Sequence, residues 1–310
     1  MRVIVYLPLL LPLLAAIGAR PLSERCEPRL ATWLLTVSSV VLAAASTSCL
    51  ALLAITGLIR FPLLAAFGHW SAPIAQRDDP AELSVALIAG MVLTVTALAA
   101  ARMLWRRAVA LAAAAQQAAC MPTPDGLIIV DDETPDAFAL PGLPGRVVVS
   151  TGMLKTLDAT EHDILLAHER EHLRAHHYLF VALAQLGAAA NPLLRPLAAA
   201  VAYTVERWAD EQAATTAGDR IRVAHTVGKA ALASQHARIR LPAAALGIIG
   251  RGGPLKGAGP VPRRVAALLA PPLHRRPALT VITAAILTAA AWSTADATYD
   301  LHLLLKAVGL

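Results

Sequence analysis

Two histidines and a glutamate near the middle of the chain have the spacing of a metal-dependent hydrolase. His168, Glu169 and His172 form the pattern His-Glu-x-x-His. On an α-helix the two histidines lie one turn apart on the same face, so both imidazoles can reach one metal ion while Glu169 stands beside them. Zinc held by two histidine nitrogens and one further ligand keeps a fourth position open for water, whose pKa the metal lowers towards neutrality. Glu169 would take the proton of that water and pass it to the leaving amine.

The segment that carries this pattern is expected to be helical. Thr160 is a good helix N-cap with Asp163 three residues later, and residues 164–166 together with Leu173 supply an apolar side that can pack. The alternative is a surface helix that is rich in histidine and glutamate without holding a metal, because further charged residues crowd the same stretch.

A third ligand should come from a separate helix, and Glu206 lies 34 residues after His172. Residues 178–203 between them are almost wholly apolar, with X-Pro steps at 191–192 and 195–196. Since proline cannot continue a helix from the preceding residue without strain, we expect a helix, a bend and a returning helix. At about 1.5 Å per residue, the return brings Glu206 back to the level of the metal.

Asp210 lies one turn after Glu206 on the same expected helix. We assign Glu206 as the third zinc ligand and Asp210 as the acceptor of the second N–H of a ligating histidine, a contact that fixes the tautomer of the ring. One Zn²⁺ per chain is expected, because a His/His/Glu set with one open position suits zinc best among the common metals. The alternative for both carboxylates is a solvated acidic helix face with Arg207 and Glu211.

Other roles stay open at this point. His176 and His177 are the next candidates for a third ligand. A group that stabilises the transition state is not identified, and the candidates by proximity are Tyr203, Arg207, Arg222 and His225.

The two motifs, His-Glu-x-x-His and Glu-x-x-Ala-Asp, resemble those of the gluzincin-type membrane metallopeptidases. That group includes the HtpX-type, the CAAX-prenyl-protease-type and the BlaR/MecR-type antirepressor peptidases. Further similar segments lie at residues 135–139, 146–154, 191–192 and 262–269, so the resemblance covers roughly residues 120–270. It implies a zincin-like α+β metallopeptidase domain.

The composition indicates an integral membrane protein, because 57% of the residues are hydrophobic and only 15% are charged. We expect a mostly α-helical chain with about four transmembrane helices, at residues 3–19, 31–59, 83–105 and 278–295. The first of these segments could instead be a cleaved signal peptide, but the arginines that follow it favour a retained helix.

The basic residues that flank these segments set the expected orientation. Arginines follow the first and third spans, whereas residues 60–82 after the second span carry no positive excess. We therefore divide the chain into a membrane region at 1–119, a cytoplasmic zinc domain at 120–276, and a fourth span with a short external tail at 277–310. The N-terminus is then external, in a multi-pass protein of the cell membrane. The tail is expected to be a short amphipathic helix at most.

Two segments of the expected zinc domain have sequence patterns that predict their structure. The β-branched runs 127–130 and 147–150 predict a small hairpin or sheet. An exposed edge strand there would let a peptide substrate add as a further strand, although a purely structural hairpin is the alternative. Each arm of residues 178–203 is too short to cross a bilayer, so we expect a hairpin that lies against the membrane or re-enters it.

A basic stretch towards the end of the domain has a plain interpretation. Its members, spread between Gly and Pro residues, could meet a nucleic-acid-binding partner, but the simpler reading is a lipid-facing cytoplasmic segment that obeys the positive-inside rule. Direct nucleic-acid binding is not expected. The stretch comprises Arg238, Arg240, Arg251, Lys256, Arg263, Arg264, Arg275 and Arg276.

Three functions remain in view. The expected order of spans is that of the BlaR/MecR type, which implies an integral-membrane zinc endopeptidase that cleaves a cytoplasmic protein, with a BlaI-like transcriptional repressor as first candidate and the chain itself as another. A penicillin-sensor domain and a Ser-x-x-Lys acylation site are not found, so binding of a β-lactam is not implied. The second function is an HtpX-like quality-control protease. The third is a membrane receptor or scaffold with a structural metal site, which would need a fourth protein ligand.

Overall fold

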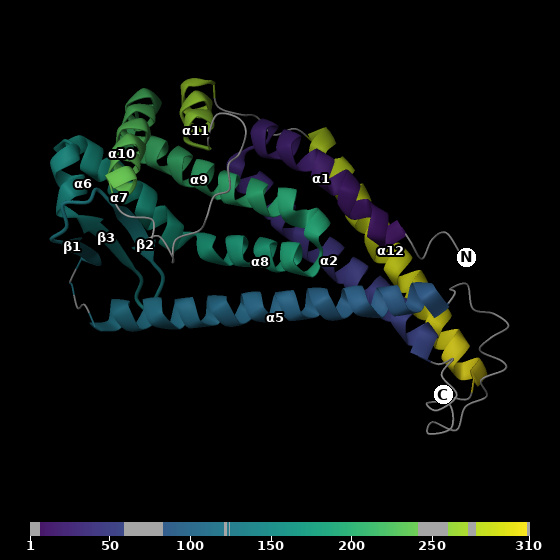
Figure 1. Ribbon diagram of the computed structural model, residues 1–310. Coiled ribbons are helices and arrows are strands. Elements are labelled where there is room, and N and C mark those ends of the chain that lie inside the picture. Colours follow the sequence, from purple (N-terminus) through teal and green to yellow (C-terminus); the bar gives the residue numbers. More distant parts are fainter. Residues whose placement is uncertain are drawn as a thin grey trace.

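The computed structural model describes residues 7–58, 83–120, 123, 125–240, 260–271 and 277–308. Long helices run side by side from one end of the molecule, and a small sheet with shorter helices forms the other end (Figure 1). The elements in chain order are α1 (Leu7–Arg25), α2 (Pro28–Leu58), α5 (Leu83–Cys120), β1 (Leu127–Val130), β2 (Ala137–Leu140), β3 (Arg146–Ser150), α6 (Thr151–Thr156), α7 (Ala159–Arg174), α8 (His177–Ala190), the short 3₁₀ helix η2 (Pro192–Leu194), α9 (Arg195–Ala217), α10 (Arg220–Arg240), α11 (Pro260–Leu269) and α12 (Pro277–Val308).

Within the described part of the chain, three helices are long and apolar enough to cross a bilayer, namely α1, α2 and α5. They coincide with the first three expected spans, although residues 3–6 and residue 59 lie outside the described residues. The expected third span forms the first part of α5, which continues without a break to Cys120. The chain is therefore mostly helical with membrane-length helices, as its composition predicts.

The fourth expected span, residues 278–295, lies within α12. This helix packs against α1 and α2 and has 32 residues. Residues 296–308 of the expected tail are helical and continue α12 without a break. The start of α1 and the end of α12 both lie at the end of the molecule that is far from the sheet (Figure 1). That α12 crosses the membrane stays a prediction.

The sheet has three strands in the order β1-β3-β2. The two β-branched runs that predict strands do pair, but in parallel, with Leu127 opposite Val147. The hairpin is formed instead by β2 and β3, which pair antiparallel with Ala137 opposite Val149. The central strand β3 is almost wholly buried, and β2 forms one edge of the sheet because β3 lies between β1 and β2.

The apolar segment between the two motifs folds as a helix, a bend and a returning helix. Helix α8 ends at Ala190, η2 makes the bend and α9 returns. The side chain of Asn191 accepts a hydrogen bond from the Leu193 N–H, and its Nδ2 donates to Ser46 Oγ of α2 at 3.0 Å. The hairpin thus packs between membrane-length helices, and the main apolar core joins it to α1, α2 and α12.

A close approach between α8 and α2 holds this hairpin in place. A Cβ atom at Gly187 would lie 2.3 Å from Ser39 Oγ and 2.9 Å from the Ser39 carbonyl oxygen. Glycine is thus required at this position because the neighbouring backbone occupies the space of a side chain.

Replacing Gly187 by alanine should destabilise the protein by about 1–3 kcal/mol, because α8 must move away from α2. Thermal unfolding of the detergent-purified protein measures this loss. The control is Gly228→Ala on α10, where a Cβ atom meets nothing within 4 Å and better helix propensity should leave stability equal or about 0.5–1 kcal/mol higher. A Gly187→Ala protein as stable as the wild type would contradict the packing described here.

Candidate metal centre

The helix that carries the His-Glu-x-x-His pattern begins earlier than the sequence suggested. Asp158, and not Thr160, is the N-cap of α7: its side chain accepts from the Glu161 N–H, and the Glu161 side chain accepts from the Asp158 N–H. This reciprocal pair is a capping box, which satisfies two backbone donors at the helix start. The Asp-x-x-Glu spacing in the sequence was the signal for it. The site itself is unaffected, because it lies two turns further along.

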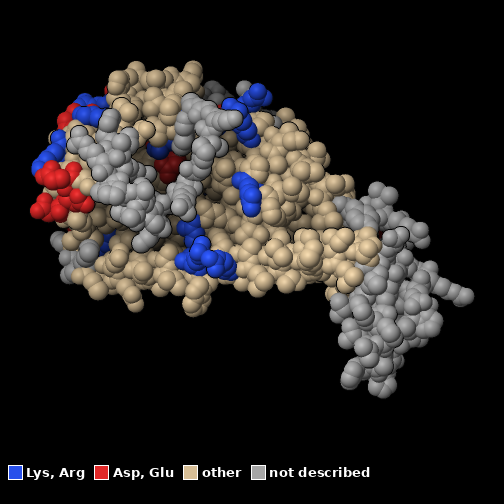
Figure 2. All heavy atoms as spheres, viewed as in Figure 1, with Lys and Arg blue, Asp and Glu red and all other residues tan. Residues whose placement is uncertain are grey.

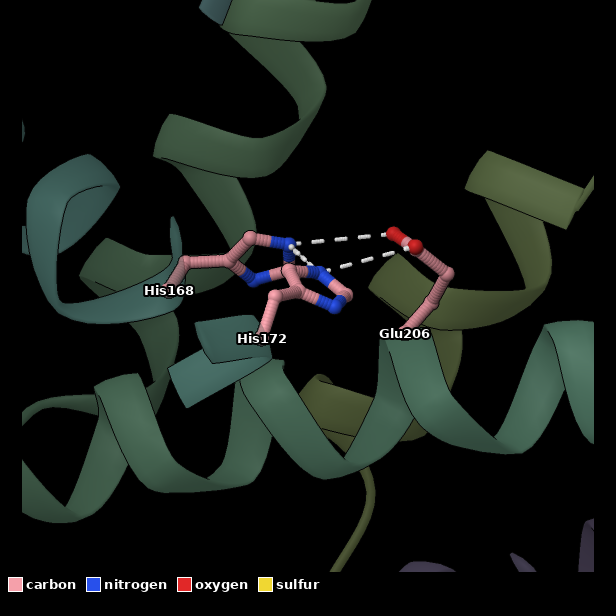
Figure 3. Close-up of side chains that lie close together, drawn as sticks. All are labelled: His168, His172 and Glu206. Atoms are coloured by element: carbon pink, nitrogen blue, oxygen red, sulfur yellow. Dashed lines mark hydrogen bonds and ion pairs between the residues drawn. The ribbon is translucent and has the colours of Figure 1, made fainter. Parts of the chain in front are cut away.

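A change of direction follows α7. Helix α7 ends at Arg174, His176 adopts the left-handed conformation with φ of 52°, and α8 begins at His177. The chain then runs through α8 and η2 and returns as α9, which packs against α7. This path places Glu206 of α9 beside the two histidines of α7 (Figure 3).

His168, His172 and Glu206 point toward one another and converge on one position. The two Nε2 atoms are 3.2 Å apart. Glu206 Oε2 lies 3.7 Å from His168 Nε2, and Glu206 Oε1 lies 3.6 Å from His172 Nε2. Ligands bound to one zinc ion at about 2.0–2.1 Å in a tetrahedron are about 3.3 Å apart, so these separations suit a zinc ion with three protein ligands. Among the described residues, this is the one group of three or more such side chains that could hold a metal ion.

The Nδ1 atoms of the two histidines face away from that position and have different partners. Asp210 Oδ1 lies 3.1 Å from His168 Nδ1, and this carboxylate is only 1% exposed. His177 Nδ1 lies 2.9 Å from His172 Nδ1. Asp210 therefore stands where the sequence analysis expected it, whereas His177 is beside a candidate ligand and does not join the converging set.

Arg264 is the charged residue at the centre that the sequence analysis missed. From α11, its Nη1 lies 2.8 Å from Glu206 Oε2, while its Nε and Nη2 donate to the two oxygens of Asp210 at 2.8 and 2.6 Å. The lipid-facing interpretation was wrong for this residue and also for Arg263, which pairs with Glu24 of α1 and lies 4.2 Å above the ring of Tyr203. The only signal was the similar segment 262–269.

Burial and charge together set the protonation of the candidate ligands. Burial by itself lowers the pKa of His168, but Asp210 and Glu206 outweigh this effect and raise it to about 10. Burial lowers the pKa of His172 to about 4. Burial also opposes ionisation of Glu206 and Asp210, yet His168 and Arg264 hold the pKa of both carboxyls below the usual value. In the absence of metal, the second candidate histidine is therefore ready to bind and the first carries a proton.

Glu169 is buried next to this cluster but is held by a different neighbour. Burial raises the pKa of its carboxyl to about 7, and a hydrogen bond from the Ala139 N–H of β2 works in the opposite direction. A carboxyl that titrates near neutral pH can both take up and release a proton there.

Two cavities meet at Glu169 and Glu206. One, of about 170 Å³, also contains Arg264 and is otherwise lined mostly by apolar residues of α7, α9 and α10. The other, of about 280 Å³, extends past His172 and His177 towards Arg107 of α5. In the space-filling view, an acidic side chain is visible at the floor of a hollow with basic side chains beside it (Figure 2). The two cavities therefore share Glu169 and Glu206 as lining residues.

The four candidates for a transition-state stabiliser are engaged elsewhere or exposed. Arg207 is buried and donates to the Ser23 carbonyl oxygen of α1, and Arg222 pairs with Asp158. Tyr203 packs below Arg263, and His225 is exposed. Arg264 lines the smaller cavity together with Glu169, so it takes their place as candidate.

Zinc binding should release about one proton near neutral pH, since His168 must lose its proton to become a ligand. The apparent zinc affinity should then rise about tenfold per pH unit between about pH 6.5 and 8.5, below the pKa of His168. Chelator competition at several pH values, with calorimetry in two buffers, measures both quantities. Asp210→Asn removes the carboxylate that raises this pKa and should flatten the dependence. An affinity that does not change with pH in the wild type would contradict the assignment.

Comparison with known proteins points in the same direction as the geometry. The family model of peptidase family M48 matches residues 100–241, which contain the converging His168, His172 and Glu206 as well as Glu169. No curated protein and no solved structure matches the chain. Because the family is one of zinc-dependent peptidases, the match and the donor set agree on the metal. The match supports a metallopeptidase of family M48.

Proposed function

We propose that the protein is an integral-membrane zinc endopeptidase in which His168, His172 and Glu206 hold the metal. One observation carries this proposal: three ligand atoms converge at a position that two cavities reach, with the buried carboxylate of Glu169 beside it. A site built to hold a metal for structure alone would close it with four protein ligands. The described residues offer three, which favours a peptidase over a receptor or scaffold with a structural metal site.

Glu169 acts as the general base and then as the general acid. When bound, zinc supplies the Lewis acid that activates water and polarises the scissile carbonyl group. Glu169 accepts a proton from water and returns it to the amine that leaves. In the metal-free site, burial raises the pKa of this carboxyl to about 7, so neither protonation state is strongly disfavoured there near neutral pH.

The edge strand β2 is the element that would hold the substrate backbone. The Asp136 carbonyl oxygen accepts from the Ser150 N–H, so the alternate residues Ala137 and Ala139 direct their backbone groups away from β3. The Ala139 N–H already donates to Glu169 and the Ala137 N–H to Asp136 Oδ1, so a substrate strand would meet the carbonyl oxygens of this edge first. Both line the cavities at the centre. A peptide that adds to this edge as a further strand would be held by its backbone, whatever its side chains.

The smaller cavity favours an apolar substrate side chain beside the scissile bond. Apart from the charged groups of the centre and two hydroxyls, its lining consists of apolar residues that include Ala213, Val223, Val227 and Ala230. Apolar surface removed from water there contributes about 25 cal/mol per Å².

We further propose that the substrate is a cytoplasmic protein and that a transcriptional repressor is the first candidate. The basic residues at the end of α1, the start of α2 and the middle of α5 support a cytoplasmic centre by the positive-inside rule, because these segments lead to the end of the molecule that carries the sheet. The order of three membrane-length helices, zinc domain and α12 is that of the BlaR/MecR type. An HtpX-like quality-control protease is the alternative function for the same centre.

Replacing Glu169 by glutamine should leave the zinc content near one ion per chain and abolish proteolysis, because the amide cannot accept the proton. Glu206→Ala should instead lose both zinc and activity. Elemental analysis of the detergent-purified variants, together with cleavage of a casein or peptide-library substrate, measures these outcomes. Cleavage by the Glu169→Gln protein at the wild-type rate would contradict the proposed role of Glu169. Full zinc content in Glu206→Ala would contradict the proposed set of zinc ligands.

The two substrate hypotheses differ in the number of proteins that are cut. In cells that produce the wild type, compared with cells that produce Glu169→Gln, new protein N-termini should appear in one or a few DNA-binding proteins. Quantitative mass spectrometry of N-terminal peptides gives this comparison. New termini in many unrelated membrane proteins, and in no DNA-binding protein, would instead support the quality-control function.

A further inference from the structure

His177 is a buried histidine that touches a candidate metal ligand from the outside. It is the first residue of α8, it is 2% exposed, and its Nδ1 lies 2.9 Å from Nδ1 of His172. The ring packs edge-on against Trp208 of α9, with ring centroids 4.8 Å apart. It also lines the larger cavity together with Glu169, His172 and Glu206.

The break between α7 and α8 is what brings this ring to His172. In an uninterrupted helix, a residue five positions later points about 140° away from the first, so the two side chains would not meet. Here the helix stops at Arg174 and His176 takes the left-handed conformation, so the next turn starts in a new direction. A left-handed residue other than glycine is uncommon, and this one sits where the direction of His177 is decided.

The positions of the nitrogen atoms settle which ring donates. Nε2 of His172 faces the metal position, 3.2 Å from His168 Nε2 and 3.6 Å from Glu206 Oε1, and must carry a lone pair in order to bind. The ring proton of His172 is then on Nδ1. Two Nδ1 atoms at 2.9 Å share one proton between them, so His172 donates and His177 accepts.

We propose that His177 is a positioning residue that accepts the Nδ1–H of His172 and thereby fixes its tautomer and ring orientation for zinc. This inference rests on the proposed function, because it assumes that His172 is a ligand. His177 would do for His172 what Asp210 does for His168. The two ligands then have unlike supports, a carboxylate for one and a neutral imidazole for the other.

A purely structural role in packing explains the contacts of His177 less well than the proposed positioning role. With its Nδ1 as acceptor, His177 carries its proton on Nε2, which is buried and has no hydrogen-bond partner among the described residues. A buried polar group in that condition costs about 1–3 kcal/mol, whereas an apolar ring would fill the same space without this cost. What an imidazole adds here is the acceptor that faces His172.

The same contacts exclude His176 and His177 as the third ligand. His177 meets the nitrogen of His172 that faces away from the metal position. His176 is exposed, and its ring packs beside Tyr178 with centroids 5.9 Å apart.

Three variants test the proposal. His177→Leu has a similar volume and no acceptor, His177→Asn places an amide oxygen near the position of Nδ1, and His176→Asn is the matched control at the neighbouring exposed histidine, where asparagine tolerates the left-handed conformation. The zinc dissociation constant is measured by chelator competition, and the metal-free variants are compared by thermal unfolding. The absorption spectrum of the cobalt-substituted proteins reports the ligand geometry directly.

We expect His177→Leu to bind zinc about 10- to 100-fold more weakly, with an altered cobalt spectrum and unchanged stability of the metal-free protein. His177→Asn should restore most of the affinity, and His176→Asn should match the wild type. Wild-type zinc affinity in His177→Leu would overturn the inference. It would also be overturned if His177→Leu and His177→Asn lost the same amount of zinc affinity and both metal-free proteins were less stable than the wild type. A wild type that binds no zinc would instead overturn the proposed function on which the inference rests.

Discussion

A carboxylate withdrawn from water needs a cation opposite to it, and two such carboxylates organise this molecule, the buried Asp210 and the half-buried Glu206. Glu206 and Asp210 lie one turn apart on α9, and desolvation alone would drive both to the neutral form. The guanidinium group of Arg264 contacts both, and His168 lies against both from the other side. Helices α7, α9 and α11 are therefore joined by charge at the point where the metal ligands converge, and separating any one of them would leave an uncompensated buried charge.

The second constraint is the hairpin of α8, η2 and α9, because it connects the two ligand-bearing helices. Its bend packs between membrane-length helices, with Asn191 bonded to Ser46 and Gly187 in close contact with Ser39. The membrane region thus determines how far α9 returns along α7. The helices that carry the candidate ligands and the long helices form one packed structure, so a movement of the long helices would also displace Glu206 on α9.

The two candidate histidine ligands have different neighbours at Nδ1, and this difference affects how each of them can bind the metal. His168 faces carboxylates and holds a proton that a metal must displace, whereas burial keeps His172 neutral and its Nδ1 lies against Nδ1 of His177. The first interaction strengthens the ligand once the proton has left, and the second directs the free Nε2 towards the metal position from the start. Glu169 stands apart from both, tied to the edge strand on which a peptide would lie.

Much of this arrangement follows from short-range rules that act within the sequence. The spacing of His168, Glu169 and His172 places them on one helix face, proline forces the bend, and long apolar runs predict membrane-length helices. The N-cap of α7 also has a local signal, because Asp158 and Glu161 have the Asp-x-x-Glu spacing of a capping box. The parallel pairing of β1 with β3 has no such signal, because it depends on how the elements pack.

The sequence by itself determined the helix that carries the two candidate histidine ligands, the bend and the position of Glu206 and Asp210 along the chain, because helix geometry and proline sterics act over a few residues. Only the tertiary structure decided that Arg264, 54 residues after Asp210, pairs with both carboxylates, and that His177 turns back onto His172. An arginine in a basic stretch looks the same in sequence whether it faces lipid or a buried carboxylate, since its partner is chosen by how the helices pack.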